Sequence, residues 1–387
     1  MKSMKILIEL TYYRPHISGL TIYAERLGCA LERRGHSVTV LTSQYDKNLP
    51  REEIMDGVRI LRVPVLMRIS KGVVMPSLGW YANRLVNKSD VISLHLPQLD
   101  AAGLAIRGMI LKKPTLITYH CDLQMPPGAL SKVANFAVNF MNHLAARATD
   151  RIISYTEDYA SNSPYLSRYR NKIQVIPPPI ELPVIAPKEK ALFRTKFKLG
   201  NQKPVIGMAA RFATEKGIEV LLNSLDAVIT RYPNVQVWFA GPYKNILGEE
   251  EYYKKYEPML NKYITSNHWR FLGPLNPSEM SAYYPNLDLL VIPSINSTES
   301  FGLVQVEAMM NGVPVVASDL PGVRQPVLQH NFGKIIPVGD SSALSKSILS
   351  LLDKPIKGKI DSSKIAHYYS PDAVAAEYEK LIQNILK

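Results

Sequence analysis

Cysteine and long apolar runs are both scarce in this chain of 387 residues. The two cysteines, Cys29 and Cys121, cannot form a disulfide framework and do not stand at a metal-ligand spacing, so a reducing cytoplasm fits best. No run of about eighteen apolar residues is present, so we expect no membrane-spanning helix. The apolar run 6–8 is too short for the core of a signal peptide, so we expect none.

Short motifs that would signal other chemistries are also missing. No two Asp residues stand two positions apart, and neither His-x-x-x-His nor Cys-x-x-Cys occurs, so we expect no metal centre and no cofactor. The sequence contains no Gly-x-x-x-x-Gly-Lys-Ser/Thr element, which disfavours a P-loop nucleotidase. The first predicted strand is not followed by Gly-x-Gly-x-x-Gly, which disfavours a dinucleotide-dependent dehydrogenase.

Basic residues outnumber acidic ones, and the excess lies in the N-terminal half. The chain has 46 Lys and Arg against 33 Asp and Glu, a net charge of +13. Residues 1–180 hold 23 against 13, a net +10, and residues 181–387 hold 23 against 20, a net +3. Such a field favours an anionic partner, a membrane surface or a phosphorylated acceptor, with ordinary solvated surface as the alternative. No nucleic-acid-binding motif is present, so nucleic acid is not an expected partner.

Strand-like and helix-like segments alternate twice along the chain, which predicts an α/β protein with two parallel sheets. In the first half we expect strands at 5–10, 37–42, 91–95, 115–119 and 151–155 and helices at 20–33 and 131–147. In the second half we expect strands at 204–208, 235–240, 269–272, 289–292, 314–317 and 334–338 and helices at 217–231, 252–265, 302–311 and 341–352.

A proline-rich run at 176–183 separates the two halves, because proline this dense continues neither a sheet nor a helix. We therefore place an N-terminal domain at 1–178 and a C-terminal domain at 184–370. A last helix, 371–387, begins with Pro371 directly after Ser370. Two such sheets would meet across a cleft at the carboxyl ends of their strands, where these folds bind ligands.

The most informative motif lies at 293–307, where Glu299 and Glu307 stand eight positions apart with Ser300-Phe301-Gly302 between them. A buried strand is expected just before this segment and a helix just after it. A helix N-terminus presents free N–H groups and partial positive charge, so it suits an anion. A carboxylate beside it suits the hydroxyls of a sugar attached to that anion.

A second motif lies at 207–217, where Arg211 and Lys216 flank a turn before Gly217. Two cations at a strand-to-helix turn suit a diphosphate, since Arg offers a planar fork and Lys a point charge. Weaker candidates are the first turn, with Ser18-Gly19 before a helix, and the segment 118–122 at the end of a strand, with His120 and Asp122.

Together these motifs resemble those of retaining glycosyltransferases with the two-domain GT-B fold, in particular family 4. The resemblance covers essentially the whole chain and implies two Rossmann-like domains, with the helix 371–387 packing back on the first. It departs at Ser18, where the family has a glycine, so the path of that loop is open. Its catalytic candidates are His120, Glu299, Arg211 and Lys216, and its acceptor candidate is Asp122. The donor-binding residues it implies are Gly19, Arg211, Lys216, Leu275, Glu299, Ser300, Phe301, Gly302, Leu303 and Glu307.

The resemblance implies transfer of a hexose from a UDP- or GDP-linked sugar to a lipid, lipid-linked or glycan acceptor in cell-envelope or polysaccharide synthesis, with no metal required. A sugar-nucleotide epimerase or a phosphorylase of the same fold is the alternative, and a silent nucleotide-sugar-binding or scaffold protein is the non-enzyme alternative. The helix 131–147, preceded by Met125–Gly128, could rest an apolar edge on a bilayer, or be an ordinary core helix. We therefore expect a cytoplasmic enzyme that associates peripherally with the plasma membrane.

Overall fold

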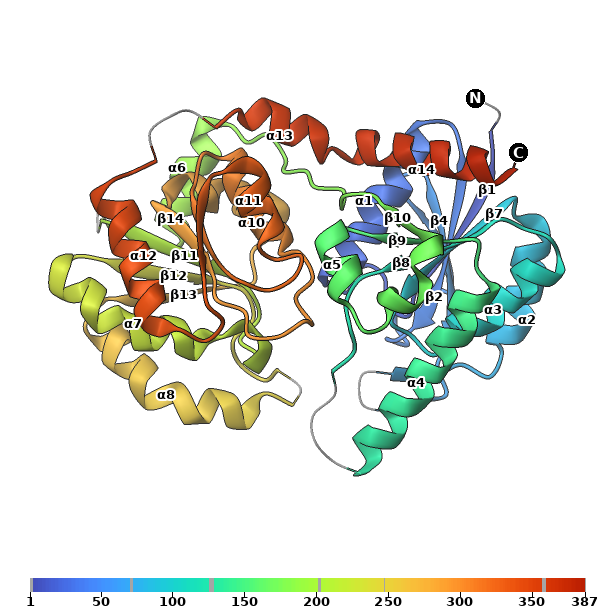
Figure 1. The fold of residues 1–387 in the computed structure, drawn as a ribbon, viewed down its shortest axis with the longest axis horizontal. Helices are drawn as coiled ribbons and strands as arrows, with labels where there is room; N and C mark the ends of the chain where they lie inside the picture. The colour runs from blue at the N-terminus through green and yellow to red at the C-terminus, as the bar shows by residue number, and fades with distance from the viewer. Residues whose placement is uncertain are drawn as a thin grey trace. The chain divides into compact units, whose positions relative to one another are not determined.

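The computed structural model describes residues 3–69, 72–124, 129–200, 203–246, 248–356 and 360–386. Its contacts divide the chain into two compact units, Met1–Ile180 with Tyr368–Lys387, and Glu181–His367. Figure 1 shows a separate sheet in each unit. The segment Met125–Gly128, which we expected to lead into a helix, lies outside the described residues.

Unit 1 is built on an eight-stranded sheet in the order β10-β9-β8-β7-β1-β2-β4-β3, parallel except for β3. Its strands are β1 (Lys5–Glu9), β2 (Ser37–Gln44), β3 (Glu52–Met55), β4 (Val58–Pro64), β7 (Val91–Leu96), β8 (Thr115–Tyr119), β9 (Arg151–Ser154) and β10 (Ile173–Val175). A small hairpin pairs β5 (Met67–Ile69) with β6 (Gly72–Val74). The central strands β7 and β8 are buried along their whole length, as expected where helices cover both faces of a parallel sheet.

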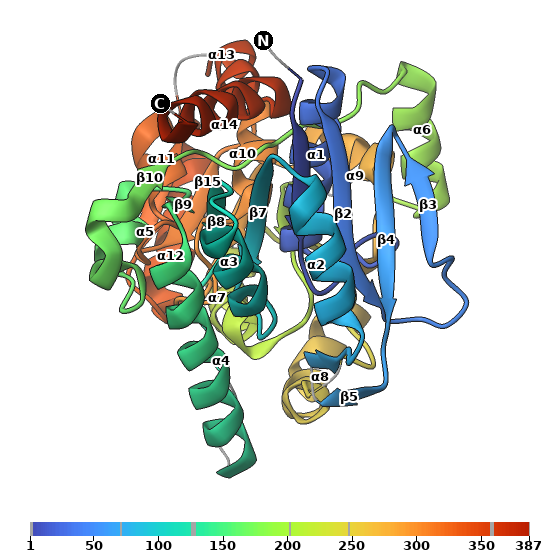
Figure 2. The ribbon, with the colours of Figure 1, turned by 90° about the vertical axis from the view of Figure 1, so that its right-hand side faces the viewer.

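One face of this sheet is covered by α1 (Gly19–Arg33) and α14 (Pro371–Leu386), and the other by α2 (Leu78–Lys88), α3 (Ala101–Ile110) and α4 (Ala129–Ala148). The short helices α5 (Glu157–Asn162) and η1 (Leu166–Lys172) lie beside β9. The C-terminal helix thus belongs to unit 1, and it begins where the hydroxyl of Ser370 accepts a hydrogen bond from the Ala373 N–H. Figure 2 shows α2, α3 and α4 side by side.

Unit 2 is built on a six-stranded parallel sheet in the order β13-β12-β11-β14-β15-β16. Its strands are β11 (Val205–Ala209), β12 (Gln236–Ala240), β13 (Trp269–Gly273), β14 (Leu289–Ile292), β15 (Val315–Ser318) and β16 (Gly333–Ile336). Its main core packs α7 (Ile218–Arg231), α8 (Glu250–Thr265) and α12 (Ser341–Asp353) on the sheet. The remaining helices are α6 (Pro187–Lys196), η2 (Thr214–Lys216), α9 (Pro277–Tyr283), η3 (Tyr284–Asn286), α10 (Leu303–Met310), α11 (Gln325–His330) and α13 (Ser362–Tyr368).

The α/β class with two parallel-sheet units is therefore confirmed. The sequence patterns missed the strands β3 to β6 and β10 and the helices α2, α3, α5, α6, α9, α11 and α13. The edge strand β3 is antiparallel and only partly buried, so it carries no continuous apolar run that would reveal it.

Candidate functional site

The order of strands in unit 2 reverses between β11 and β14, because the chain moves from β11 to β12 on one side and from β14 to β15 on the other. In open parallel sheets, ligands bind outside the carboxyl ends of the strands at such a point. The two loops that leave the sheet there are residues 210–217 and 293–302. These are the segments that carry the two strongest sequence motifs, so the fold brings both motifs to one place.

The two loops are in direct contact. Gly217 caps α7 with a positive φ of 64°, and a Cβ added there would lie 2.0 Å from the carbonyl oxygen of Pro293. The Ile295 N–H donates a hydrogen bond of 3.0 Å to the carbonyl of Glu215. Only glycine fits at 217, because the loop after β14 occupies the space of a side chain.

Two ion pairs line this junction. Lys216 Nζ lies 2.6 Å from Glu299 Oε2, so one pair joins the two loops. Arg211 Nη2 lies 2.5 Å from Glu215 Oε1 within the loop after β11, and its side chain is 41% exposed. Burial acts to raise the pKa of Glu215, but the charge of Arg211 and the hydrogen bonds of the carboxylate outweigh it, so the pKa lies below its ordinary value. The junction therefore holds two cations whose present partners are carboxylates.

The loop after β14 ends at the N-terminus of α10. Gly302 is the N-cap residue with a φ of 76° and makes no side-chain cap, while Ser300 and Phe301 are buried. The Gln305 side-chain amide holds this backbone, since its Nε2 donates to the carbonyls of Phe301 and, at 3.0 Å, of Val323. The N–H groups that begin α10 directly follow the loop that carries Glu299, an arrangement suited to a phosphate group.

Glu307 lies on α10 and is buried, and its Oε2 accepts a hydrogen bond of 2.7 Å from the Tyr284 hydroxyl. Tyr284 was not identified as a site residue from the sequence. Its hydrogen bond to Glu307 in the structure is what makes it one of the candidates. Leu275 is half-buried in the loop between β13 and α9, and β13 is an edge strand two positions away from β11. The structure thus joins Arg211, Lys216 and Glu299 at one junction, and places Leu275 on a different loop.

In unit 1, His120 directly follows β8 and is buried, with both ring nitrogens engaged. Its Nε2 lies 2.8 Å from Nδ1 of His95, and its Nδ1 is hydrogen-bonded to the Tyr155 hydroxyl. Tyr23 packs edge-on against His120 and stacks on Tyr155. A ring nitrogen of His120 can reach a ligand only if one of these hydrogen bonds opens.

The histidine pair is neutral. Burial lowers the pKa of His95 to about 3, and burial together with His95 holds the pKa of His120 well below its ordinary value. If the Tyr155 O–H donates to His120, the His120 Nε2–H donates to His95, and the His95 Nε2–H has no partner among the described residues. The pair therefore acts as a fixed dipole rather than as a charge near neutral pH.

Asp122 is buried and tied to unit 1. Its Oδ1 accepts hydrogen bonds from the Tyr119 hydroxyl at 2.9 Å and the Ser163 hydroxyl at 2.6 Å, and its N–H lies 2.6 Å from the Tyr159 hydroxyl. Its Oδ2 is buried without a hydrogen-bond partner among the described residues. Oδ2 of Asp122 can therefore accept a hydrogen bond from a further donor.

At the first turn, Ser18 caps α1 through a hydrogen bond of 3.2 Å from the Thr21 N–H to its hydroxyl. The hydroxyl explains why serine suits this position, because glycine has no side chain to cap the helix. Gly19 begins α1, and a Cβ added there would meet nothing within 4 Å. A residue with a side chain would therefore fit at position 19 without a steric clash.

One buried carboxyl at this edge of unit 1 was missed by the sequence patterns. Glu9 ends β1, beside β7, where the strand order of this sheet also reverses, and it accepts a hydrogen bond from Gln98. Burial, with Asp100 nearby, holds the pKa of Glu9 well above its ordinary value, and burial raises the pKa of Asp100 to about 6. The sequence signal that could have revealed Glu9 is its position as a glutamate at the end of an apolar strand.

Metal-ligand clusters and membrane-spanning helices are both lacking in the part of the chain that the structure describes. No group of three or more His, Cys, Asp or Glu side chains there could hold a metal ion. Among the same residues, every helix is either too short or too polar to cross a bilayer.

Known proteins match both halves of the chain. The family pattern of glycosyltransferase family 4 matches residues 17–183, and that of glycosyl transferases group 1 matches residues 189–368. Phosphatidyl-myo-inositol mannosyltransferase of Mycobacterium leprae (strain TN) is 26% identical over 86% of this chain and 83% of its own. Alpha-monoglucosyldiacylglycerol synthase of Streptococcus pneumoniae (strain ATCC BAA-255 / R6) is 24% identical over 86% of this chain and 75% of its own.

A solved structure matches the whole fold. Anabaena Alr3699/HepE in complex with UDP-glucose covers 98% of this chain and 100% of its own, with a TM-score of 0.76 and 19% sequence identity. This likeness shows the two-domain GT-B fold that the sequence predicts. Because the two family patterns together match residues 17–183 and 189–368, and the second includes the junction of Arg211, Lys216 and Glu299, the chain belongs to the group 1 glycosyltransferases of family 4.

Proposed function

We propose that this glycosyltransferase is a retaining enzyme that transfers a hexose from a UDP- or GDP-linked sugar to a lipid, lipid-linked or glycan acceptor in cell-envelope or polysaccharide synthesis. The observation that carries the proposal is the junction where Lys216 pairs with Glu299, beside Arg211 and the N-terminus of α10. Cations, the N-terminus of a helix and a carboxylate in one place match a diphosphate joined to a sugar.

In this proposal Arg211 and Lys216 turn from their carboxylate partners to the diphosphate, which the N–H groups of Ser300–Leu303 also bind. These fixed charges stabilise the leaving diphosphate electrostatically, without a required metal ion. Glu299, released from Lys216, accepts hydrogen bonds from sugar hydroxyls, and Glu307 accepts them from the ribose. The UDP-glucose complex of the Anabaena protein supports a nucleotide-sugar donor.

We place the acceptor on unit 1, with Asp122 as a binding residue and Gly19 and Leu275 as peripheral donor contacts. The printed names of two relatives, a phosphatidyl-myo-inositol mannosyltransferase and a monoglucosyldiacylglycerol synthase, support a lipid acceptor and peripheral association with the cytoplasmic face of a membrane. His120 lies near the reacting carbon in this scheme, and transfer follows a same-face route through an oxocarbenium-like state.

A thermal-shift panel tests the donor half. UDP, GDP, ADP and dTDP and their sugar conjugates are added to the wild type, to Arg211→Ala and to Arg231→Ala, a matched control on the far end of α7. A ligand at one hundred times its Kd stabilises the fold by about 2.7 kcal/mol. We expect stabilisation by one base, lost in Arg211→Ala and kept in Arg231→Ala. No stabilisation by any nucleotide contradicts the proposed donor site.

Product analysis then separates the reaction classes. Release of nucleoside diphosphate only in the presence of a lipid acceptor, with the α-linked or β-linked configuration of the donor kept in the product, supports retaining transfer. Conversion of the nucleotide sugar without acceptor would instead indicate an epimerase. Dependence on inorganic phosphate would indicate a phosphorylase.

A further inference from the structure

Three helices form one continuous layer on a face of unit 1. α3 packs against α2 on one side and against α4 on the other, and the buried sides of all three contact the sheet core. Figure 2 shows this layer turned toward the viewer. We call the outer side of the layer, which faces away from the sheet, the α2–α4 face.

The α2–α4 face carries charge of one sign. The three helices contain no Asp or Glu within 78–88, 101–110 and 129–148. The exposed basic side chains are Arg84 and Lys88 on α2, Lys132 and Arg147 on α4, and Lys112 just after α3, while the exposed carboxylates Asp90 and Asp150 lie just after α2 and α4. An ordinary solvated surface mixes both signs, whereas the charged side chains within these three helices are all basic.

Large apolar side chains stand exposed among these cations. Trp80 on α2 is 61% exposed, Ile110 on α3 is 69% exposed and Phe136 on α4 is 74% exposed, with Met109 and Phe140 exposed beside them. The Arg84 guanidinium lies 5.8 Å from the Trp80 ring centre, and the rings of Phe136 and Phe140 stack 6.3 Å apart. Aromatic and apolar side chains interspersed with Lys and Arg are typical of surfaces that lie in the headgroup region of a bilayer.

We propose that the α2–α4 face docks on an anionic lipid bilayer. This inference rests on the proposed lipid acceptor and names the surface that would bring unit 1 to it. Charge complementarity selects the occupant, because the exposed charges within α2 and α4, and at Lys112 just after α3, are all positive and favour an anionic surface over a protein partner of mixed charge. The exposed rings then enter the headgroup layer between the cations.

The test measures co-sedimentation of the full chain with phosphatidylcholine vesicles, with and without phosphatidylglycerol. Lys112→Gln with Lys132→Gln removes two exposed cations, and Phe136→Ser with Phe140→Ser removes the ring pair. Matched controls are Lys254→Gln with Lys255→Gln on α8, and Leu328→Ser on α11, all exposed side chains of unit 2.

We expect binding only to the anionic vesicles, weakened by salt. Each Lys or Arg near an anionic membrane changes the affinity about fivefold, so the double Lys variant should bind about twenty-five-fold more weakly. The double Phe variant should also lose binding, and both controls should bind like the wild type.

Equal binding to both kinds of vesicle, or an equal loss in the controls, overturns the proposal. A dimer that light scattering detects at every salt concentration, and that the double Phe variant no longer forms, also overturns the proposal. The α2–α4 face would then be a contact between two copies of the chain. The nucleotide thermal shift, measured on the same variants, separates this proposal from the proposed function. A kept shift with no vesicle binding refutes only the docking face, whereas a missing shift refutes the donor site.

Discussion

Glu215 sets the electrostatic cost of bringing a phosphate to Arg211. It is an ionised carboxylate in contact with the Arg211 guanidinium, and the carbonyl of the same residue is tied to the loop after β14. A diphosphate bound by Arg211 must lie close to this negative charge, or displace it. Either arrangement costs free energy, which the binding of the proposed donor must offset.

We therefore expect Glu215→Gln to bind nucleoside diphosphate more tightly, by about fivefold, since a repulsion near 1 kcal/mol is removed. Titration calorimetry with the nucleotide selected by the thermal-shift panel measures this. Glu251→Gln on α8, an exposed glutamate paired with Lys254, is the matched control. Weaker binding by Glu215→Gln would show instead that the carboxylate is needed to hold Arg211 in its binding position.

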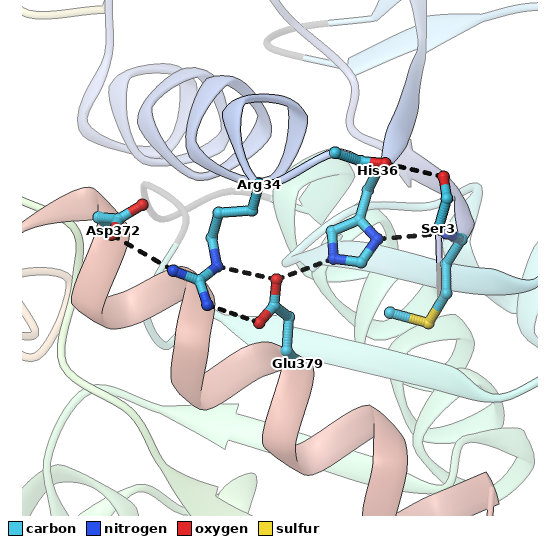
Figure 3. A network of polar contacts seen from close by, with 7 residues as sticks. Ser3, Arg34, His36, Asp372 and Glu379 are labelled. Atoms are coloured by element: carbon cyan, nitrogen blue, oxygen red, sulfur yellow. Dashed lines mark hydrogen bonds and ion pairs between the residues drawn. The ribbon is translucent and has the colours of Figure 1, made fainter. Parts of the chain in front are cut away.

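At the scale of elements, α14 is the piece that completes unit 1. Its Tyr378 hydroxyl lies 2.7 Å from the hydroxyls of both Tyr23 and Thr118, in the face that also holds His120. Its Glu379 accepts two hydrogen bonds of 2.8 Å from Arg34 and one of 2.8 Å from His36 (Figure 3). His36 in turn accepts from the Met4 N–H, so the helix is linked to the beginning of the chain.

The Glu379 contacts predict a pH-dependent stability. The hydrogen bonds from Arg34, aided by the one from His36, lower the pKa of Glu379 below its ordinary value of 4.5. A lowered folded-state pKa contributes stability above the unfolded pKa, and that stability is lost as the pH falls through the folded pKa. Glu379→Gln should therefore cost about 2 kcal/mol at neutral pH, with a smaller cost below about pH 4.

Thermal unfolding of the wild type and variant across pH 3–8 checks this. Glu377→Gln, an exposed glutamate on the same helix, is the control and should change the melting temperature little at any pH. A Glu379→Gln cost that stays constant down to pH 3 would contradict the assignment of the effect to the carboxylate.

At the scale of the whole molecule, the two units differ in how the chain builds them. Unit 2 is one continuous stretch, Glu181–His367, whereas unit 1 needs both 1–180 and 368–387. The buried side of α14 contributes Val374, Tyr378, Leu381 and Ile382 to unit 1. Burying each large apolar side chain stabilises a fold by about 1.5–3 kcal/mol, so losing this helix should be severe.

We expect residues 181–367 expressed alone to unfold cooperatively and to keep the nucleotide thermal shift. Residues 1–180 alone should be poorly folded by near-UV circular dichroism, and a peptide of residues 368–387 added in trans should restore the signal. A well-folded 1–180 fragment would show that α14 is dispensable for unit 1. A fragment 181–367 that folds but fails to bind, while the full chain binds, would place donor residues in unit 1.

The sequence alone determined those local elements whose signals lie in neighbouring residues, and the residue types of the candidate site. β8 was predicted at 115–119 and α14 from Pro371, because a short continuous apolar run and a proline after a serine are signals contained in a few neighbouring residues. The two cations Arg211 and Lys216 and the carboxylate motif at 299–307 were also readable from residue types and spacing.

Only the tertiary structure decided which of these residues meet. Lys216 and Glu299 are 83 positions apart, and they form an ion pair because β11 lies beside β14. His95 and Tyr155 engage the two ring nitrogens of His120 because β7, β8 and β9 are neighbours. Local periodicity reports which face of an element is buried, but the order of strands depends on how all the elements pack together.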